Sequence, residues 1–333
     1  MNRHIKLKWV FKAFFISLAI SAVFSQGKPS WAKSPSKGKG GEADRPRLFG
    51  EIQTGLEYDS NIFQDNIQEE SDMVWVSSLT LNYRPDLVRW STLAAHNSYL
   101  GNSELSYSFF EVGADRPFGK KDYGSFFVQI SPSAPLDKDE SIGPPVTLGS
   151  YGFSAIYDRD LTRTWNSGLS FSYDQLNYNA TFAAKDTKLF KVGFPQFIRP
   201  DRTWRFLVDL SLESGQARGG RVPSSTAPGG FRQDDISYRA DVFSLQASYP
   251  VSHLSRLRVR YRVRRKIYTT NNTNDLFHFN RKDTNHQFLV GLRHRSSPKV
   301  TLRFRLKYLW RESTDRFVEF DEVLLSFSAA YRF

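Results

Sequence analysis

The sequence predicts an all-β fold, a transmembrane antiparallel up-and-down β-barrel of about 14 strands. From Leu48 onward, segments of roughly ten residues alternate apolar and polar side chains, which gives each strand one apolar and one polar face. The connections between these segments are alternately short and long, as in a barrel whose two ends face different compartments. The last segment, Val323 to Phe333, has the eleven residues that a tilted strand needs to cross a hydrocarbon core.

Composition agrees with a barrel. The chain of 333 residues has no Cys, an aromatic fraction of 15% and a mean hydropathy of −0.47. No run approaches the roughly 18 apolar residues of a membrane helix. A barrel needs only this modest average because alternate residues alone face lipid. The absence of Cys excludes a disulfide framework, a thiol nucleophile and a thiolate metal site.

Residues 1–32 are predicted to be a signal peptide. Basic residues precede an apolar run from Phe14 to Phe24, and Ser30-Trp31-Ala32 offers a small-x-small cleavage site. An uncleaved anchor is the alternative, although the run is short for one. Residues 33–46, rich in Lys, Gly, Ser and Pro, are predicted to be a flexible periplasmic leader, and residues 47–333 the transmembrane barrel. A nucleic-acid arm would have a similar composition, but no nucleic-acid partner is expected for an exported chain.

The first predicted strand, residues 48–58, sets the pattern. Leu48, Ile52 and Leu56 share one face, and acidic and amide side chains occupy the other. The strand ends at Asp59-Ser60-Asn61. This tripeptide has too few oxygen ligands for a calcium loop, so an Asx-type turn is the favoured interpretation.

The remaining strands repeat this unit. The third alternates poorly and the eighth is ambiguous, whereas the others show apolar residues two positions apart. Trp and Tyr residues gather at strand ends, as at a membrane interface, whereas a soluble β-sandwich would distribute them through its core. The expected strands after the first lie near 73–83, 88–99, 105–109, 123–131, 151–157, 165–173, 187–197, 204–212, 243–249, 257–267, 288–292, 300–310 and 323–333.

An even number of strands puts both termini on the same side of the membrane. Connections after even strands are short, and those after odd strands are long. Only the connection near 100–103 breaks this rule. The expected long connections are 59–71, 132–147, 174–186, 214–234, 269–283 and 311–321.

The net charge of +12 is unevenly distributed, because residues 256–311 hold sixteen Lys and Arg but only two acids. Asp241, Asp209 and Glu213 are expected to balance part of this excess. Two interpretations stay open: a solvated, partly salt-bridged wall, or a cationic lining that attracts anions. Arg265 falls on the lipid face, where it would pair with lipopolysaccharide phosphate or snorkel. The predicted lumen-lining cations, here called the basic wall, are Arg258, Arg260, Arg262, Arg264, Lys266, Arg293, Arg295, Arg303, Arg305 and Lys307.

No catalytic site, metal site or cofactor is predicted. The sequence lacks a Gly-x-Ser-x-Gly nucleophile motif and a His-Glu zinc-binding pattern. His278 and Asp275 share an expected outer loop. A hydrolytic site there is the alternative to ordinary loop polarity, and loop polarity is preferred.

Two stretches resemble known families. The final strand, with Tyr331 and the terminal Phe333 on its apolar face, resembles the last strand of Gram-negative outer-membrane β-barrels, which implies recognition by the barrel-assembly machinery. Gly55-Leu56-Glu57 followed by Tyr58, Asp59, Ser60 and Asn61 is similar to the opening of two barrel families. One is the β-barrel porins associated with exopolysaccharide export. The other is the fourteen-stranded barrel of the surface lipoprotein assembly modifiers, where a helical-repeat domain precedes the barrel in place of the short leader expected here.

These features predict a porin-like channel in the bacterial outer membrane, with a cationic lumen wall that conducts or exports anionic solutes or polysaccharide. The alternative is a structural or accessory barrel, a secretion or surface-assembly partner, whose lumen is occluded by the connection at 214–234. No enzyme activity is expected. The expected partners are outer-membrane lipid, lipopolysaccharide, the barrel-assembly machinery and an anionic solute or polysaccharide.

Overall fold

The computed structural model describes residues 47–333 apart from 63–69, 86, 136–145 and 224–230. The predicted signal peptide and leader therefore lie outside the described residues. Within them, no helix is long and apolar enough to cross a membrane.

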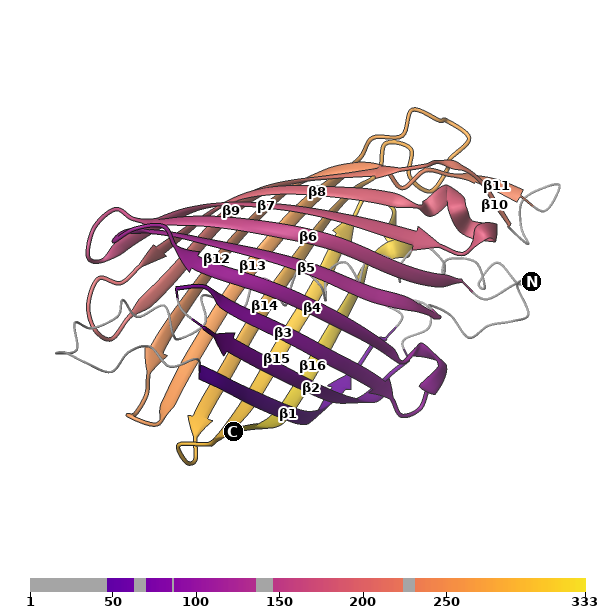
Figure 1. Ribbon diagram of the computed structural model, residues 1–333. Coiled ribbons are helices and arrows are strands. Elements are labelled where there is room, and N and C mark those ends of the chain that lie inside the picture. The colour runs from indigo at the N-terminus through magenta and orange to yellow at the C-terminus, as the bar shows by residue number, and fades with distance from the viewer. Residues whose placement is uncertain (1–46, 63–69, 86, 136–145, 224–230) are drawn as a thin grey trace.

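Fourteen of the described strands close into an antiparallel barrel, as predicted (Figure 1). Each pairs with the next barrel strand along the chain, and β1 closes on β16. Closure satisfies the backbone hydrogen bonds within the barrel, which a lipid environment requires. The barrel strands are β1 (Arg47–Asp59), β2 (Asp72–Arg84), β3 (Arg89–Tyr99), β4 (Tyr107–Pro117), β5 (Asp122–Pro135), β6 (Thr147–Asp160), β7 (Trp165–Tyr178), β8 (Thr187–Ile198), β9 (Arg205–Ala217), β12 (Tyr238–Pro250), β13 (Ser255–Tyr268), β14 (Lys282–Arg295), β15 (Val300–Ser313) and β16 (Phe320–Arg332).

Short elements occupy the long connections. β10 (Gly220–Pro223) and β11 (Phe231–Asp234) pair with each other between β9 and β12. Gly219 and Gly220 have φ values of 69° and 144°, which L-residues adopt only with strain, so glycine is needed where the chain turns from β9 into this hairpin. The 3-10 helices are η2 (Ser103–Leu105), η4 (Ala180–Lys185) and η6 (Arg316–Val318).

Alternation along the strands gives the barrel an apolar outer surface. On β16, Leu325, Phe327 and Tyr331 are exposed, while Ser328 and Ala330 on the other face are buried. Exposed aliphatic and aromatic residues recur with the same period of two on the other barrel strands. The face opposite them lines the inside of the barrel, and we call it the inward face.

The seam between β1 and β16 uses both stretches that carry the family resemblance. Phe333 and Gly50 exchange two backbone hydrogen bonds of 3.1 Å, and the Phe333 ring covers Gly50 so closely that a Cβ there would lie 2.3 Å from a ring atom. At the other end of the seam, Ser60 Oγ accepts a hydrogen bond from the Val323 amide at 2.8 Å. The first and last barrel strands therefore meet through Phe333, Ser60 and Val323, which belong to these two stretches.

The Asx-type turn predicted after β1 is confirmed. The Asn61 amide donates to Asp59 Oδ1 at 3.0 Å, and Asn61 Nδ2 donates to the Asp321 carbonyl at 3.2 Å. The tripeptide turns the chain and ties it to β16.

Several strands extend further into the long connections than the sequence predicted. β7 continues to Tyr178 and β9 to Ala217, within segments predicted as connections. At the end of β7 and the adjoining end of β8 the inward residues are apolar, for example Leu176 and Leu189, which are buried. The outward residues there are polar, for example Asn177 and Lys188, which are exposed, so the alternation of the membrane-spanning part is reversed although the backbone pairing continues.

In the sequence, Leu105, Tyr107 and Phe109 are spaced two residues apart, which predicted that they share the apolar outer face of the fourth strand; this prediction was wrong. Leu105 lies in η2, and the exposed outward residues of β4 are Phe110 and Val112, which places Tyr107 and Phe109 on the inward face. Aromatic residues occur on both faces of this stretch, so hydrophobicity alone could not assign the faces. The register with β5 assigns them.

A compact apolar cluster packs between the ends of several strands, at the end of the barrel where the long connections lie. η4 and the β10–β11 hairpin lie together at this end in Figure 1. The cluster joins them to inward residues of β6, β7, β8, β12 and β13, and Ile236 packs against it. We call this unit the loop-end cap. Its buried apolar residues are Val146, Leu148, Leu176, Tyr178, Phe182, Ala184, Leu189, Val222, Tyr238, Ala240 and Tyr268.

Candidate functional site

The strands β13, β14 and β15 carry cations on the face opposite their exposed aromatic and aliphatic residues. On β13, Arg260, Arg264 and Lys266 are buried, whereas Arg265 is exposed on the outer surface. Residues directly opposite each other on neighbouring strands have side chains on the same face, so the cross-strand pairs also assign the inward residues of β14 and β15. The inward positions occupied by predicted cations are Arg258, Arg260, Arg262, Arg264 and Lys266 on β13, Arg293 and Arg295 on β14, and Arg303, Arg305 and Lys307 on β15.

At the end of the short turns, three arginines form one row across the strands. Arg293 is directly opposite Arg256 on β13 and Arg303 on β15. Like charges in this position repel. Arg303 Nη2 lies 2.6 Å from Glu51 Oε1, and Arg303 also bonds to Gln53. In the described residues, Arg256 and Arg293 have no carboxylate within salt-bridge distance, so the row keeps an excess of positive charge.

Near the cap, by contrast, the basic wall is neutralised. Arg264 forms an ion pair with Glu213, and Tyr238 Oη donates to the same carboxylate at 2.5 Å. Lys191 on β8 lies directly opposite Glu213. Lys266 Nζ donates to Tyr268 Oη at 2.8 Å and lies 4.0 Å from the centre of that ring. These contacts hold the cap-side cations in place.

The middle of the basic wall differs from both ends. Arg258, Arg262, Arg305 and Lys307 have no carboxylate within salt-bridge distance among the residues that the structure describes. Successive inward residues on one strand are about 7 Å apart. The cations therefore make a line of positive charge along the barrel interior. Carboxylates such as Asp209 and Glu57 lie within electrostatic range of Arg262 and Arg305 but form no ion pair with them.

The expectation that Asp241 balances the basic wall was wrong. Asp241 is exposed on the outer surface and lies directly opposite Arg265 in the β12–β13 register. Asp209 and Glu213 are on the inward face, but only Glu213 forms an ion pair there in the described part of the chain. Whether an acid faces the lumen or the outer surface depends on a shift of one residue, because neighbours on a strand face opposite sides.

Sequence reasoning missed several inward cations. Arg256 precedes the alternating run that marked β13, and Arg311 follows the one that marked β15. Lys191 lies on the ambiguous eighth strand. All three cations occupy inward positions, and continuing the inward–outward alternation of each strand to its observed ends would have identified them.

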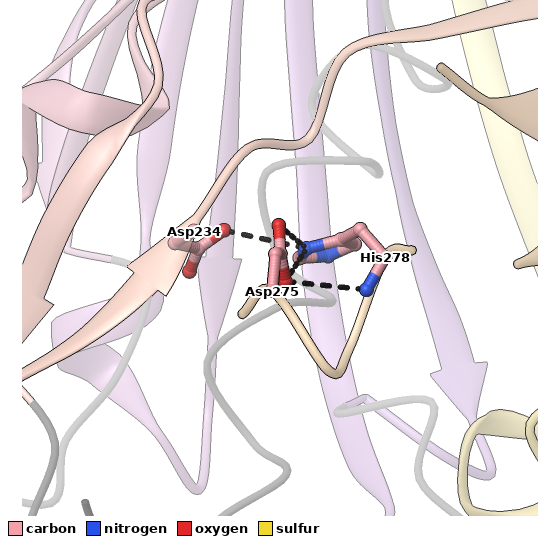
Figure 2. A group of neighbouring side chains, drawn as sticks. All are labelled: Asp234, Asp275 and His278. Atoms are coloured by element: carbon pink, nitrogen blue, oxygen red, sulfur yellow. Dashed lines mark hydrogen bonds and ion pairs between the residues drawn. The ribbon is translucent and has the colours of Figure 1, made fainter. Parts of the chain in front are cut away.

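The loop-end cap contains a buried polar cluster (Figure 2). Asp275 and His278, from the β13–β14 connection, meet Asp234 at the end of β11; His278 Nδ1 lies 3.0 Å from both Asp275 oxygens and 3.6 Å from Asp234 Oδ1. On its other side, Asp234 Oδ2 lies 3.5 Å from Lys185 Nζ and 3.3 Å from Arg232 Nη2. The sequence paired His278 with Asp275 but missed Asp234, because about 40 residues separate them along the chain and only the cap joins them.

The charges around Asp234 decide its protonation. Burial alone would raise the pKa of this carboxyl, but Lys185, His278 and Arg232 outweigh burial and hold the pKa below its usual value. Asp234 is therefore ionised at neutral pH, and it links η4, the β10–β11 hairpin and the β13–β14 connection.

Among the described residues, His278 and Asp275 have no hydroxyl group bonded to the imidazole that would complete a hydrolytic triad. His278 Nδ1 faces the two carboxylates, and Nε2 has no hydrogen-bond partner in the described residues. A hydroxyl nucleophile would have to bond to this ring. The pair is a structural or ligand-binding feature of the cap.

No protein-family model matches the sequence, and no curated protein matches it. Solved structures do match. A bacterial polysaccharide outer membrane secretin is 10% identical with a TM-score of 0.51, over 85% of this chain and 98% of that one. The outer membrane channel DcaP of Acinetobacter baumannii is 9% identical with a TM-score of 0.50, over 86% and 97%. The monoaromatic hydrocarbon channel CymD is 11% identical with a TM-score of 0.51, over 87% and 89%.

The fold is that of an outer-membrane β-barrel. Closed antiparallel barrels with an apolar outer belt are the form in which β-sheets cross the bacterial outer membrane. The chain has this closed sheet and this belt, so its location is the bacterial outer membrane. As an outer-membrane β-barrel it is porin-like in architecture, and its inward face is the surface that a solute would meet.

Proposed function

We propose that this outer-membrane β-barrel is a channel whose basic wall draws anionic solutes or an anionic polysaccharide through the lumen. The observation that carries the proposal is the set of inward cations without a carboxylate within salt-bridge distance in the described residues: Arg258, Arg262, Arg305 and Lys307. Cations in a confined, low-dielectric channel raise the local concentration of anions.

The spacing of the cations supports a solute that moves along the wall. Alternate residues Arg258, Arg260 and Arg262 place three cations in a row, about 7 Å from one to the next, before the wall is neutralised at Arg264. A multivalent or polymeric anion can pass from one cation to the next without losing all its contacts. Among the proteins of similar fold, one is described as a polysaccharide outer membrane secretin, one as an outer membrane channel and one as a monoaromatic hydrocarbon channel.

Ion selectivity in planar bilayers tests the proposal. In a salt gradient, the wild-type reversal potential should indicate anion preference. The preference should weaken as salt rises, because the Debye length falls from about 10 Å at 0.1 M to about 3 Å at 1 M. Replacing Arg260, Arg262 and Arg305 with Glu should shift the reversal potential toward cation preference.

Arg265→Glu is the matched control, because Arg265 is exposed on the outer surface. It should leave the reversal potential unchanged. If Arg265→Glu alters selectivity while the triple replacement does not, the proposed conduction path along the basic wall is wrong.

The loop-end cap favours a second candidate, an accessory barrel with an occluded lumen. Its apolar cluster packs on the inward faces of five strands, where a plug would lie. Such a barrel would act through a secretion or surface-assembly partner. A purified barrel that inserts into bilayers but carries no current would favour this role, and single-channel currents would favour the channel.

Contacts with the envelope belong to the same proposal. Arg265, exposed beside Asp241, would meet lipopolysaccharide phosphate, and Tyr331 and Phe333 would present the assembly signal. If a variant without both aromatic side chains reached the outer membrane in the same amount as the wild type, the assembly role would be contradicted.

A further inference from the structure

We infer that Asp234, Asp275 and His278 in the loop-end cap form a binding site for one divalent transition-metal cation, with zinc as its probe. This site is distinct from the basic wall and does not depend on whether the barrel conducts. It is built from residues of two separate connections, shown together in Figure 2.

The spacing of the ligand atoms suits a metal. His278 Nδ1 lies 3.0 Å from each Asp275 oxygen and 3.6 Å from Asp234 Oδ1. Zinc binds nitrogen and carboxylate oxygen at about 2.1 Å, which separates tetrahedral ligands by about 3.4 Å. One imidazole with two carboxylates suits zinc or another first-row divalent ion better than magnesium or calcium, which prefer oxygen ligands alone.

An unsatisfied acceptor faces the centre of the cluster. Asp234 Oδ1 accepts no hydrogen bond in the described part of the chain, although Asp234 is only 1% exposed. It points at His278 in Figure 2. Tyr178 lies within electrostatic range of Asp234, and its buried hydroxyl also has no hydrogen-bond partner among the described residues. A metal would use the free lone pair on Asp234, whose burial without a partner is otherwise costly.

The surrounding groups hold the carboxylates as outer-shell partners hold metal ligands. Lys185 and Arg232 form their ion pairs with the far oxygen of Asp234, Oδ2, and Oδ1 accepts no hydrogen bond in the described residues. Asp275 Oδ2 accepts from the Asp235 amide at 2.7 Å. The Tyr268 ring lies 4.9 Å from the His278 ring and limits its rotation. The three ligands are therefore positioned before any ion binds.

A bound ion would join the β10–β11 hairpin to the β13–β14 connection. Lys185, at the end of η4, touches the same Asp234, so three connections meet at one point. Because the ligands come from elements far apart in the sequence, ion binding would stabilise the closed cap against local opening.

Zinc retention by the folded barrel tests the inference. The full chain, folded in detergent and treated with a chelator, is incubated with zinc chloride, desalted, and analysed for metal by mass spectrometry. We expect about one zinc per wild-type chain. Asp234→Asn and His278→Ala should each weaken binding by at least about tenfold, since loss of a ligand costs no less than loss of an outer-shell partner. A heat-dependent shift in gel mobility verifies that each variant is folded.

His253→Ala is the matched control, because His253 is exposed in the turn between β12 and β13 and should not affect zinc retention. The inference is overturned if the wild type retains no zinc, or if His278→Ala retains as much as the wild type. Retention of calcium in preference to zinc would also overturn it. These outcomes leave the reversal-potential test of the channel unaffected.

Discussion

At the scale of single residues, the alternation of inward and outward positions along a strand decides the environment of each side chain. Arg264 and Arg265 are neighbours in the chain, yet Arg264 is buried against Glu213 and Arg265 is exposed on the outer surface beside Asp241. An identical guanidinium is thus a buried ion-pair partner in one place and a surface group in the other.

The first prediction concerns this contrast. Arg264→Met leaves Glu213 buried without its main partner and should destabilise the barrel by about 3 kcal/mol, the usual cost of breaking a buried pair from one side. Arg265→Met should change stability by less than about 1 kcal/mol. Urea unfolding in lipid vesicles measures both. Adding Glu213→Gln to Arg264→Met should recover part of the loss, and no recovery would mean that the loss comes from packing.

The second prediction concerns the terminal residue. Deleting Phe333 removes two backbone hydrogen bonds to Gly50 and the ring that covers it, whereas Phe333→Ala removes the ring alone. Both should slow barrel closure in detergent, the deletion more strongly. The rate at which the heat-modifiable band appears measures this. Equal rates for the deletion and the wild type would show that the seam closes without this contact.

At the scale of elements, several strands both span the membrane and form part of the loop-end cap. Their central parts alternate because one face meets lipid and the other the lumen. The cap-side ends of β6, β7, β8, β12 and β13 carry apolar inward residues and enter the cap. The same strand therefore has its apolar face toward lipid in the membrane and its apolar face toward the barrel interior at its cap-side end.

The third prediction tests the cap. Lys185→Met leaves Asp234 with a weaker set of partners in a buried site, so the cap should open more often. Limited proteolysis with a non-specific protease in chelator-containing buffer should cut the long connections several-fold faster, while the barrel stays heat-modifiable. Lys188→Met, on the exposed face of β8, is the control and should be cut at the wild-type rate. Equal rates for both variants would show that Lys185 does not hold the cap.

At the scale of the whole molecule, closure of β1 on β16 determines the barrel. Without it, two strands would present free backbone edges to lipid, at high cost. The exposed apolar belt also predicts that the folded chain needs detergent or lipid to stay dispersed.

The fourth prediction tests the register of this closure. Gly50 and Phe333 exchange both backbone hydrogen bonds, so alternate pairs such as Gln53 and Ala330 are the close, non-hydrogen-bonded kind. Because the chain has no native Cys, Gln53→Cys with Ala330→Cys should form a disulfide on oxidation and abolish the heat-induced shift in gel mobility. The pair Gln53→Cys with Ser328→Cys, displaced by two residues, should cross-link much more slowly. Faster cross-linking of the displaced pair would mean a different register.

The sequence by itself determined the fold class, the strand number and most of the facing of side chains. These follow from a period of two and from the length of a membrane-crossing strand, both of which are local properties. Prediction failed where the local pattern was ambiguous, as on β4 with Tyr107 and Phe109, and where strands continued into the cap with the apolar residues on the inward face.

Only the tertiary structure decided which charges meet. Asp234 lies beside residues some 40 positions away, because loop packing sets this contact and leaves no periodic signal in the sequence. The outward position of Asp241, by contrast, follows from alternation with Leu245 and Tyr249, and only its pairing with Arg265 needed the register. The basic wall could be read from alternation on single strands. Its compensation by Glu213 and Glu51, and the cluster of Asp234, Asp275 and His278, required the closed barrel, since long-range pairing brings those side chains together.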